Sequence, residues 1–339
     1  MNIIKKTAAA LAGASFLAMA STSAFAAGHL KELVVAYFLE WPTPNQFAQA
    51  NKLYSKELGI PVKWVSFDAG TAMSAAMASG DVHISFSQGV TPFLVATAAG
   101  QDLQIVDVAV SYSDNDNCVV RSELEATKEN AKEKLMGKKV AVPLGTAAHS
   151  GFLAQMKYFG IAESDLNIVD MAPADSAAAF TQPNTDLAMA CGWGGALRTM
   201  KTAGSPIIEG KEKEKVVGKV FDVTSIPTSF GEENPDLLAK FLAVTAKMNA
   251  DYAKNAKPMM DSISKAAGMD MEGTAAVIKT FVFPTVEEQL SAEWMGGGVA
   301  DYLTASAKAL EEGGKIKALA DYSALVNDTY LKKAASMAN

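Results

Sequence analysis

Residues 140–161, VAVPLGTAAHSGFLAQMKYFGI, form the stretch that decides how the fold is interpreted. The first three residues are an apolar run that is typical of a buried parallel strand. Pro143 and Gly145 end that strand, and Thr146 is placed to cap a following helix. Apolar residues then recur at helical spacing as far as Gly160, a residue type that favours a helix end. The stretch therefore predicts a strand, a glycine turn and a capped helix.

The start of this predicted helix is a candidate anion site. A helix N-terminus has free backbone N–H groups and the positive end of the helix dipole, and both favour an anion. The candidate contacts are Thr146, Ala147, Ala148 and His149, whose ring belongs to the first helical turn. The alternative is an ordinary strand–helix unit without a ligand, in which His149 bonds only a neighbouring loop.

The first 26 residues have the pattern of a secretory signal peptide. Lys5 and Lys6 form a basic start, residues 8–20 are an apolar segment too short to span a bilayer, and residues 24–26 (AFA) form a cleavage site. We expect cleavage after Ala26 and export to the periplasm. No cysteine stands at the cleavage point, so no lipid anchor is expected.

The exported chain is acidic and long enough for two lobes. Cleavage leaves 313 of the 339 residues and lowers the formal net charge from −7 to −9. This charge argues against a nucleic-acid partner. About 310 residues is more than one hydrophobic core usually holds. We therefore expect two lobes in an exported, monomeric protein.

Two halves of the chain share one order of elements, which predicts two α/β lobes of related design. In each half, strands alternate with helical stretches and a glycine-containing loop closes the unit. This pattern predicts parallel-rich sheets flanked by helices, with ligands bound beyond the carboxyl ends of the strands. The predicted strands are 33–36, 62–67 and 82–86 in the first half, and 140–142, 166–169 and 187–191 in the second.

The connections between the lobes are predicted at two places. The polar stretch 111–117 is interpreted as the outward crossing and the strand 220–225 as the return. The resulting division is 27–113 for the first part of lobe 1, 114–222 for lobe 2, and 223–339 for the return to lobe 1 and a helical C-terminal part. The charged run 209–215 is expected to be a solvated loop. Two hinge crossings place both lobes on facing walls of one cleft.

The two cysteines are Cys118 and Cys191. An even number of cysteines in an oxidising compartment favours a disulfide, although two buried free thiols are the alternative. Two thiols and three scattered histidines do not form a metal-ligand set, so we expect no metal and no cofactor. No nucleophile–base or phosphate-loop motif is present, which favours a binding protein over an enzyme.

Several acidic, aromatic and amide side chains at the predicted strand ends are candidate ligand contacts. Carboxylates could form charge-assisted hydrogen bonds with a ligand ammonium, and an aromatic face could share that cation. Each carboxylate could instead serve a turn or a helix cap, and Asp68 before Gly70 is well placed for that role. The candidates are Glu40, Trp41, Asp68, Gln88, Trp193 and Asp222.

With these residues placed, the chain resembles the periplasmic taurine-binding proteins of ABC importers. That family lies within a wider superfamily that binds sulfonates, nitrate and thiamine precursors. The resemblance covers nearly the full mature length. The segments that carry it are Val34-Val35-Ala36-Tyr37, Phe67-Asp68-Ala69-Gly70, residues 78–82 (ASGDV), Val142-Pro143 with Thr146 and His149, Phe159-Gly160-Ile161, Asp222-Val223, Glu233-Asn234-Pro235 and Asp321-Tyr322-Ser323.

The resemblance implies a two-lobed periplasmic-binding-protein fold (type II) that closes on a small zwitterion. It places the sulfonate at residues 146–148 and a cleft tryptophan at Trp193. It also implies a non-enzymatic receptor that delivers taurine, a source of sulfur and nitrogen, to an inner-membrane ABC permease. Loop 38–44 is one residue longer than in the best-known members, which alters the wall facing the ammonium. Hypotaurine, an alkanesulfonate or nitrate are alternative ligands, and an exported enzyme on the same scaffold is an alternative of another class.

Overall fold

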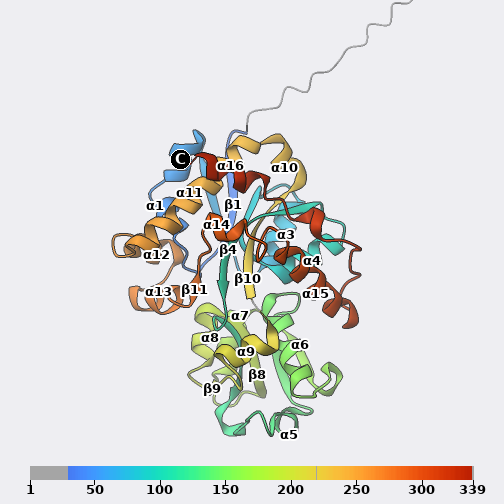
Figure 1. Ribbon diagram of the computed structural model, residues 1–339. Coiled ribbons are helices and arrows are strands. Elements are labelled where there is room, and N and C mark those ends of the chain that lie inside the picture. The colour runs from blue at the N-terminus through green and yellow to red at the C-terminus, as the bar shows by residue number, and fades with distance from the viewer. Residues whose placement is uncertain (1–29, 219, 338–339) are drawn as a thin grey trace, which may run out of the picture. The chain divides into compact units, whose positions relative to one another are not determined.

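The computed structural model describes residues 30–218 and 220–337, so the predicted signal peptide lies outside the described residues. Residues 31–339 form one compact unit. Within this unit, helices surround two separate sheets, and we call the part built on the first sheet lobe 1 and the part built on the second lobe 2 (Figure 1).

Lobe 1 is built on a six-stranded sheet in the order β11-β4-β10-β3-β1-β2. Strand β1 pairs in parallel with both β2 and β3, whereas β10 pairs antiparallel with both β3 and β4. The strands are β1 (Leu33–Phe38), β2 (Val62–Phe67), β3 (Ile84–Gly89), β4 (Leu103–Tyr112), β10 (Val220–Pro227) and β11 (Phe281–Val282). The helices between the first four strands are α1 (Asn45–Ala50), α2 (Leu53–Leu58), α3 (Gly70–Ala78) and α4 (Val90–Ala98).

Lobe 2 is built on a five-stranded sheet in the order β7-β6-β8-β5-β9. Strands β6, β7 and β8 pair in parallel, and β5 pairs antiparallel with β8 and β9. The strands are β5 (Asp116–Arg121), β6 (Lys139–Val142), β7 (Asn167–Asp170), β8 (Leu187–Trp193) and β9 (Gly204–Ser205). The helices are α5 (Ala131–Leu135), α6 (Ala147–Tyr158), α7 (Pro173–Phe180), α8 (Gly194–Met200) and α9 (Gly210–Val217).

Both sheets are mixed, which corrects the expectation of parallel-rich sheets. The parallel pairs belong to the repeated units, where helical crossovers keep consecutive strands in one direction. Strands β4 and β10 extend from lobe 1 toward lobe 2 (Figure 1), and β5 follows β4 along the chain as the first strand of lobe 2. The chain leaves lobe 1 along β4 and returns along β10, so these two strands run in opposite directions and pair antiparallel. Strand β5 likewise runs opposite to β8 in lobe 2.

The stretch 140–161 folds as its pattern predicts. Strand β6 ends at Val142, and Thr146 Oγ1 caps α6 by accepting a hydrogen bond from the His149 N–H at 3.4 Å. Gly160 follows the helix with a φ of 68°, a left-handed conformation that glycine adopts without strain. On α6, Phe152 is fully buried and packs in the lobe 2 core. Burial of this apolar face, worth roughly 2 kcal/mol for a side chain of this size, holds α6 against the sheet.

The predicted disulfide between Cys118 and Cys191 is confirmed. The two residues lie directly opposite each other on β5 and β8. Both are buried in the lobe 2 core, next to the apolar side of α6. The bond therefore joins two neighbouring strands inside the core of lobe 2.

The prediction that residues 209–215 form a solvated loop is wrong. They begin α9, and the Lys213 side chain in the middle of that helix is only 1% exposed. Helical spacing separates Lys213 from its exposed charged neighbours and turns it toward the protein. The local composition shows a charged run, but only the packing of α9 shows which lysine is buried.

The C-terminal part is mostly helical, as predicted, and its helices pack against elements of lobe 1. The predicted capping box is confirmed, because the Glu288 N–H donates to Thr285 Oγ1 at 3.2 Å while the Thr285 N–H donates to the Glu288 carboxylate at 2.8 Å. The helices are α10 (Thr228–Glu233), α11 (Pro235–Lys254), α12 (Met260–Ala267), α13 (Met271–Ile278), α14 (Val286–Gln289), α15 (Gly298–Glu312) and α16 (Thr329–Met337).

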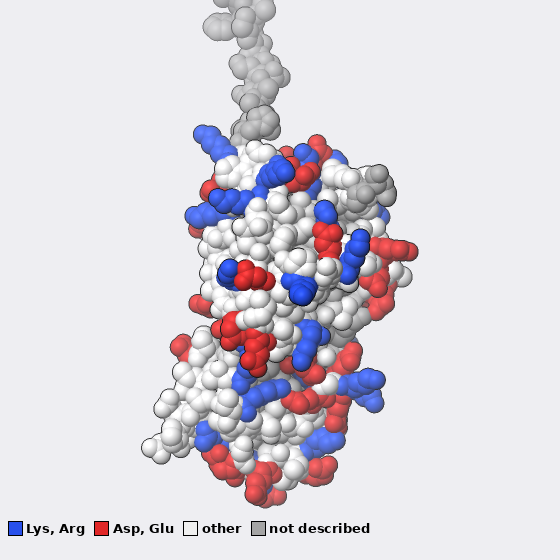
Figure 2. Space-filling view, turned by 90° about the vertical axis from the view of Figure 1, so that its left-hand side faces the viewer, with Lys and Arg blue, Asp and Glu red and all other residues white. Residues whose placement is uncertain are grey.

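The surface carries charges of both signs. On the face that Figure 2 shows, Lys and Arg side chains are interspersed with Asp and Glu side chains over both lobes. In the described part of the chain, no helix combines the length and the apolar composition that a membrane crossing requires.

Candidate functional site

A cavity lies between the lobes, at the ends of the strands that connect them. About 360 Å³ in and around it is free of protein atoms, a volume that includes space open to solvent. Both lobes contribute to it, and its lining combines aromatic rings, glycines and two carboxylates. The lining residues are Phe38, Trp41, Gly70, Gly89, Pro92, Tyr112, Asp116, Thr146, Ala147, Trp193 and Asp222.

Three helix N-termini contribute to the lining. Gly70 begins α3, Gly89 is the N-cap of α4, and Thr146 with Ala147 begins α6. The Thr146 hydroxyl satisfies the His149 N–H, which leaves the N–H groups of Ala147 and Ala148 without a partner inside the helix. Aligned helix dipoles and free N–H groups make this side of the cavity favourable for an anion.

Asp222 adds a carboxylate to the same lining and lies on β10 opposite Gly89 of β3. It is 3% exposed, and both of its carboxylate oxygens accept hydrogen bonds, from Ser87 Oγ at 2.9 Å and from Tyr112 Oη at 3.0 Å. The Trp41 indole N–H donates to Ser87 Oγ at 2.9 Å and so supports the same network. Burial raises the pKa of Asp222 to about 7, because removal from water disfavours the charged form.

Ser87 holds an unusual backbone conformation within this network. Its φ of 59° lies in the left-handed region, which a residue other than glycine adopts at a cost of about 1 kcal/mol or more. The same residue connects the Trp41 indole to the Asp222 carboxylate. The strain at the end of β3 therefore positions a hydroxyl that both accepts from Trp41 and donates to Asp222.

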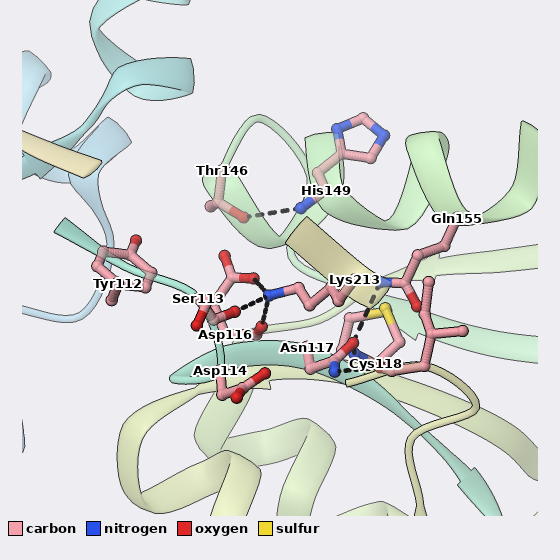
Figure 3. A network of polar contacts seen from close by, with 12 residues as sticks. Tyr112, Ser113, Asp114, Asp116, Asn117, Cys118, Thr146, His149, Gln155 and Lys213 are labelled. Carbon is pink, nitrogen blue, oxygen red and sulfur yellow. Dashed lines mark hydrogen bonds and ion pairs between the residues drawn. A yellow bond between two sulfur atoms is a disulfide. The ribbon is translucent and has the colours of Figure 1, made fainter. Parts of the chain in front are cut away.

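Asp116 is the second carboxylate of the cavity and is 2% exposed. Its Oδ1 lies 3.1 Å from the Nζ atom of Lys213 (Figure 3). Its Oδ2 has no hydrogen-bond partner among the described residues. The negative charge of Asp116 also repels that of Asp222, and this repulsion contributes to the raised pKa of Asp222.

The structure brings together half of the predicted contacts. Five of them line the cavity: Trp41, Thr146, Ala147, Trp193 and Asp222. The other five do not belong to the lining: Glu40, Asp68, Gln88, Ala148 and His149.

Glu40 contacts the other lobe rather than the cavity. Its carboxylate lies against Gly195 in the first turn of α8, where a Cβ atom on Gly195 would be 2.6 Å from the Glu40 carboxyl carbon. Its backbone has a φ of 54°, and its N–H donates to the Ala267 carbonyl at 2.7 Å. A carboxylate at a helix N-terminus is stabilised by the helix dipole, so this placement is electrostatically favourable.

Gln88 and Asp68 lie beneath and beside the start of α3. The Gln88 amide nitrogen donates to the Gly70 carbonyl and to Ser74 Oγ, both at 2.7 Å, while its oxygen accepts from Ser225 Oγ at 2.9 Å. Gln88 therefore holds α3 against β3 and β10. Asp68 is exposed, and the N-cap of α3 is Ala69, so the alternative role of Asp68 as a helix cap is not observed.

His149 supports the loop before α6. Its Nδ1 accepts a hydrogen bond from the Gly145 N–H at 3.1 Å, while its Nε2 lies 4.0 Å from Glu163 Oε1. The ring points away from Asp116 (Figure 3). Burial is the main reason why the pKa of His149 is lowered, and the positive charge of Lys315 lowers it further.

Six lining residues were not among the predicted contacts: Phe38, Gly70, Gly89, Pro92, Tyr112 and Asp116. A usable signal existed for five of them. Tyr112 and Asp116 lie in the polar stretch interpreted as the outward crossing, and crossing segments must pass the cleft. Gly70, Gly89 and Pro92 belong to helix starts at the ends of lobe 1 strands, where ligands of α/β sheets bind.

The lobes contact each other on either side of the cavity. Thr91 Oγ1 on α4 and Ser150 Oγ on α6 are 2.7 Å apart, and Lys315 Nζ pairs with Glu163 Oε1 at 2.8 Å. The Phe38 ring of lobe 1 lies 6.5 Å from the Trp193 ring of lobe 2. These contacts describe lobes that are closed around the cavity.

Gly70→Ala is expected to destabilise the protein by about 1–3 kcal/mol and to weaken ligand binding. A Cβ atom at position 70 would lie 2.7 Å from Pro92 Cγ, and the proline ring cannot rotate away. Chemical denaturation and calorimetric titration would measure the two effects. Gly313→Ala is the matched control, because its Cβ atom would meet ordinary contacts of 3.5 Å or more. Unchanged stability of Gly70→Ala would contradict the close packing at this helix start.

Comparisons with known proteins identify a family, relatives and the fold. The family described as NMT1/THI5 like matches residues 45–258. A taurine-binding periplasmic protein of Escherichia coli (strain K12) is 27% identical over 296 residues, which are 85% of this chain and 89% of that protein. A putative aliphatic sulfonates-binding protein of the same organism is 32% identical over 190 residues, 55% of either chain. The crystal structure of the periplasmic aliphatic sulphonate binding protein SsuA from Escherichia coli has a TM-score of 0.69 at 20% identity, over 89% of this chain and 99% of that one, and confirms the two-lobed fold.

Proposed function

The chain belongs to the NMT1/THI5-like family, and we propose that it is a periplasmic receptor that captures taurine for an ABC importer. The observation that carries the proposal is the polarity of the cavity. Helix N-termini in the lining favour a sulfonate, and the buried Asp222 in the same lining favours an ammonium. Taurine carries these two groups on a two-carbon chain.

The alternative ligand is an alkanesulfonate without an amine. This alternative is supported by the relatives whose names specify aliphatic sulfonates. Such a ligand would use the helix N-termini but would place an apolar tail against Asp222 and Asp116. Asp222 beside an apolar tail is unfavourable, because its carboxylate loses hydration without gaining a positive partner.

Calorimetric titration of the mature protein, unfolded and refolded to remove carried-over ligand, tests the proposal. The panel is taurine, hypotaurine, ethanesulfonate and nitrate. We expect 1:1 binding of taurine that is at least about 10-fold tighter than binding of ethanesulfonate, the margin that one charge-assisted hydrogen bond supplies. Equal binding of ethanesulfonate would identify a general sulfonate receptor instead. No binding across the panel would refute the assignment of this ligand class.

The affinity for taurine is expected to rise with pH up to about pH 7. Asp222 has a raised pKa of about 7, so its carboxyl group is protonated below that pH and must lose its proton to pair with an ammonium. Below the pKa, one coupled proton changes the apparent affinity by about 10-fold per pH unit. Titrations at pH 5, 6, 7 and 8 would measure this dependence, with ethanesulfonate as the control. A taurine affinity that does not change between pH 5 and 8 would contradict pairing with Asp222.

The proposal includes delivery to an inner-membrane permease by a monomer that performs no reaction. A receptor returns its ligand unchanged, whereas an enzyme on the same scaffold would consume it. Prolonged incubation with taurine followed by mass spectrometry distinguishes the two. Recovery of all the taurine supports the receptor, and loss of taurine that depends on intact protein would support an enzyme.

A further inference from the structure

Lys213 is a buried cation that reaches the wall of the cavity from outside it. The side chain extends from α9 and is 1% exposed. Its ammonium group donates to the Ser113 carbonyl at 2.6 Å, to the Asp116 carbonyl, and to Asp116 Oδ1 at 3.1 Å (Figure 3). These three acceptors match the three N–H donors of a lysine. The Lys213 side chain therefore has no donor left for a ligand.

Asp116, which lines the cavity, keeps one oxygen of this ion pair without a partner among the described residues. In Figure 3 one carboxylate oxygen is joined to Lys213 by a dashed line, and the other is not joined to any residue. That second oxygen, Oδ2, is buried without a hydrogen-bond partner among the described residues. A buried carboxylate oxygen without a donor costs about 1–3 kcal/mol or more, so a donor group brought by a ligand would be favourable.

The two carboxylates of the cavity differ in what they can still accept. Both oxygens of Asp222 already accept hydrogen bonds from Ser87 and Tyr112. Asp116 and Asp222 carry two potential negative charges, and Lys213 supplies one positive charge next to them. A ligand with one positive charge and N–H donors would balance this wall in both charge and hydrogen bonds.

We propose that Asp116 Oδ2 accepts a hydrogen bond from the ligand ammonium and selects an amine-bearing sulfonate, with Lys213 as the residue that positions Asp116. This inference rests on the proposed function and adds a contact to it. It requires that the ligand ammonium carry an N–H group that donates a hydrogen bond, so a positive charge without an N–H group would not satisfy Asp116 Oδ2. Asp116 starts β5, directly opposite Trp193 on β8, so the contact belongs to lobe 2 and forms when the lobes close.

Lys213 positions Asp116 through the chain connections between the lobes. Ser113 follows β4 and Asp116 begins β5, so both belong to the outward crossing. Helix α9 precedes β10 and the return crossing. The three hydrogen bonds of Lys213 therefore hold the two crossings together. They also occupy one Asp116 oxygen and leave the other without a protein donor among the described residues.

Asp116→Asn tests the contact by comparing two ligands, taurine and the amine-free ethanesulfonate, in calorimetric titration. The variant is expected to bind taurine about 10-fold more weakly and to bind ethanesulfonate within about 2-fold of the wild type. Asp114→Asn is the matched control, because Asp114 carries the same charge two residues before Asp116 but does not line the cavity. Its carboxylate accepts a hydrogen bond from the Gly210 N–H. The control is expected to leave the affinity ratio of the two ligands unchanged.

Lys213→Met tests the positioning role. The variant is expected to reduce the preference for taurine by about 10-fold, and Asp116→Asn/Lys213→Met is expected to reduce it no further than Asp116→Asn alone. The double variant removes both buried charges, so it remains informative if the unpaired Asp116 carboxylate prevents Lys213→Met from folding. Additive losses in the double variant would overturn the positioning role.

The outcomes separate this inference from the proposed function. If the wild type binds taurine more tightly than ethanesulfonate and Asp116→Asn keeps the same ratio, the Asp116 contact is refuted and the receptor for taurine stands. An equal loss for both ligands would show that Asp116 only maintains the fold, and would also refute the contact. If the wild type binds neither ligand, the proposed function itself fails.

Discussion

Asp222→Asn is expected to weaken taurine binding by about 100-fold, equivalent to about 3 kcal/mol. The substitution keeps the size of the side chain and one acceptor oxygen but removes the charge that we propose pairs with the ligand ammonium. The site is buried, so water cannot replace the lost interaction. Calorimetric titration at pH 8, above the raised pKa of about 7, would measure the full effect.

Asp107→Asn provides the matched control for this variant. Asp107 lies on β4, is also 3% exposed, and accepts a hydrogen bond from Thr224 Oγ1 at 2.9 Å. It is not part of the cavity lining. We expect this control to lower stability without changing the ratio of taurine to ethanesulfonate affinity. If Asp222→Asn bound taurine as tightly as the wild type, Asp222 would have no role in ammonium recognition.

Cys118→Ala/Cys191→Ala is expected to lower the free energy of unfolding by roughly 4 kcal/mol. The disulfide closes a loop of 73 residues, so its removal greatly increases the conformational freedom of the unfolded chain. The substituted residues lie in the lobe 2 core, where alanine is tolerated but leaves a small void. Chemical denaturation of the variant and the wild type would measure the difference.

Measuring taurine binding by the variant shows whether the disulfide affects only stability or also the ligand site. Asp116 and Trp193 are paired two residues away from the cysteines on the same two strands. The hydrogen-bond ladder of β5 and β8 also sets their register, so we expect the folded variant to bind taurine within about 3-fold of the wild type. A reducing agent should destabilise the wild type and leave the variant unaffected. Equal stability of the two proteins would contradict the predicted contribution of the bond.

The sequence by itself determined the local elements and their order. The strand, turn and helix of residues 140–161 could be predicted because apolar periodicity, Thr146 and Gly160 act within one or two turns of the chain. The cysteine pairing was favoured by the cysteine count and the expected compartment, and it is present. The resemblance to a known family indicated the two-lobed fold, and the solved structure of a relative confirms that fold.

Only the tertiary structure decided which polar side chains meet. Glu40 and Asp222 are both acidic residues near strand ends, yet the Glu40 carboxylate lies against Gly195 of α8 while Asp222 is buried in the cavity wall. Lys213 was one charge of a run that looked solvated, and it pairs with Asp116, which is 97 residues away along the chain. The antiparallel pairing of β4, β5 and β10 could not be predicted from the sequence either. Sequence patterns report the burial of a residue within its own element, whereas contacts between distant elements depend on how the two lobes pack, and no local pattern contains that information.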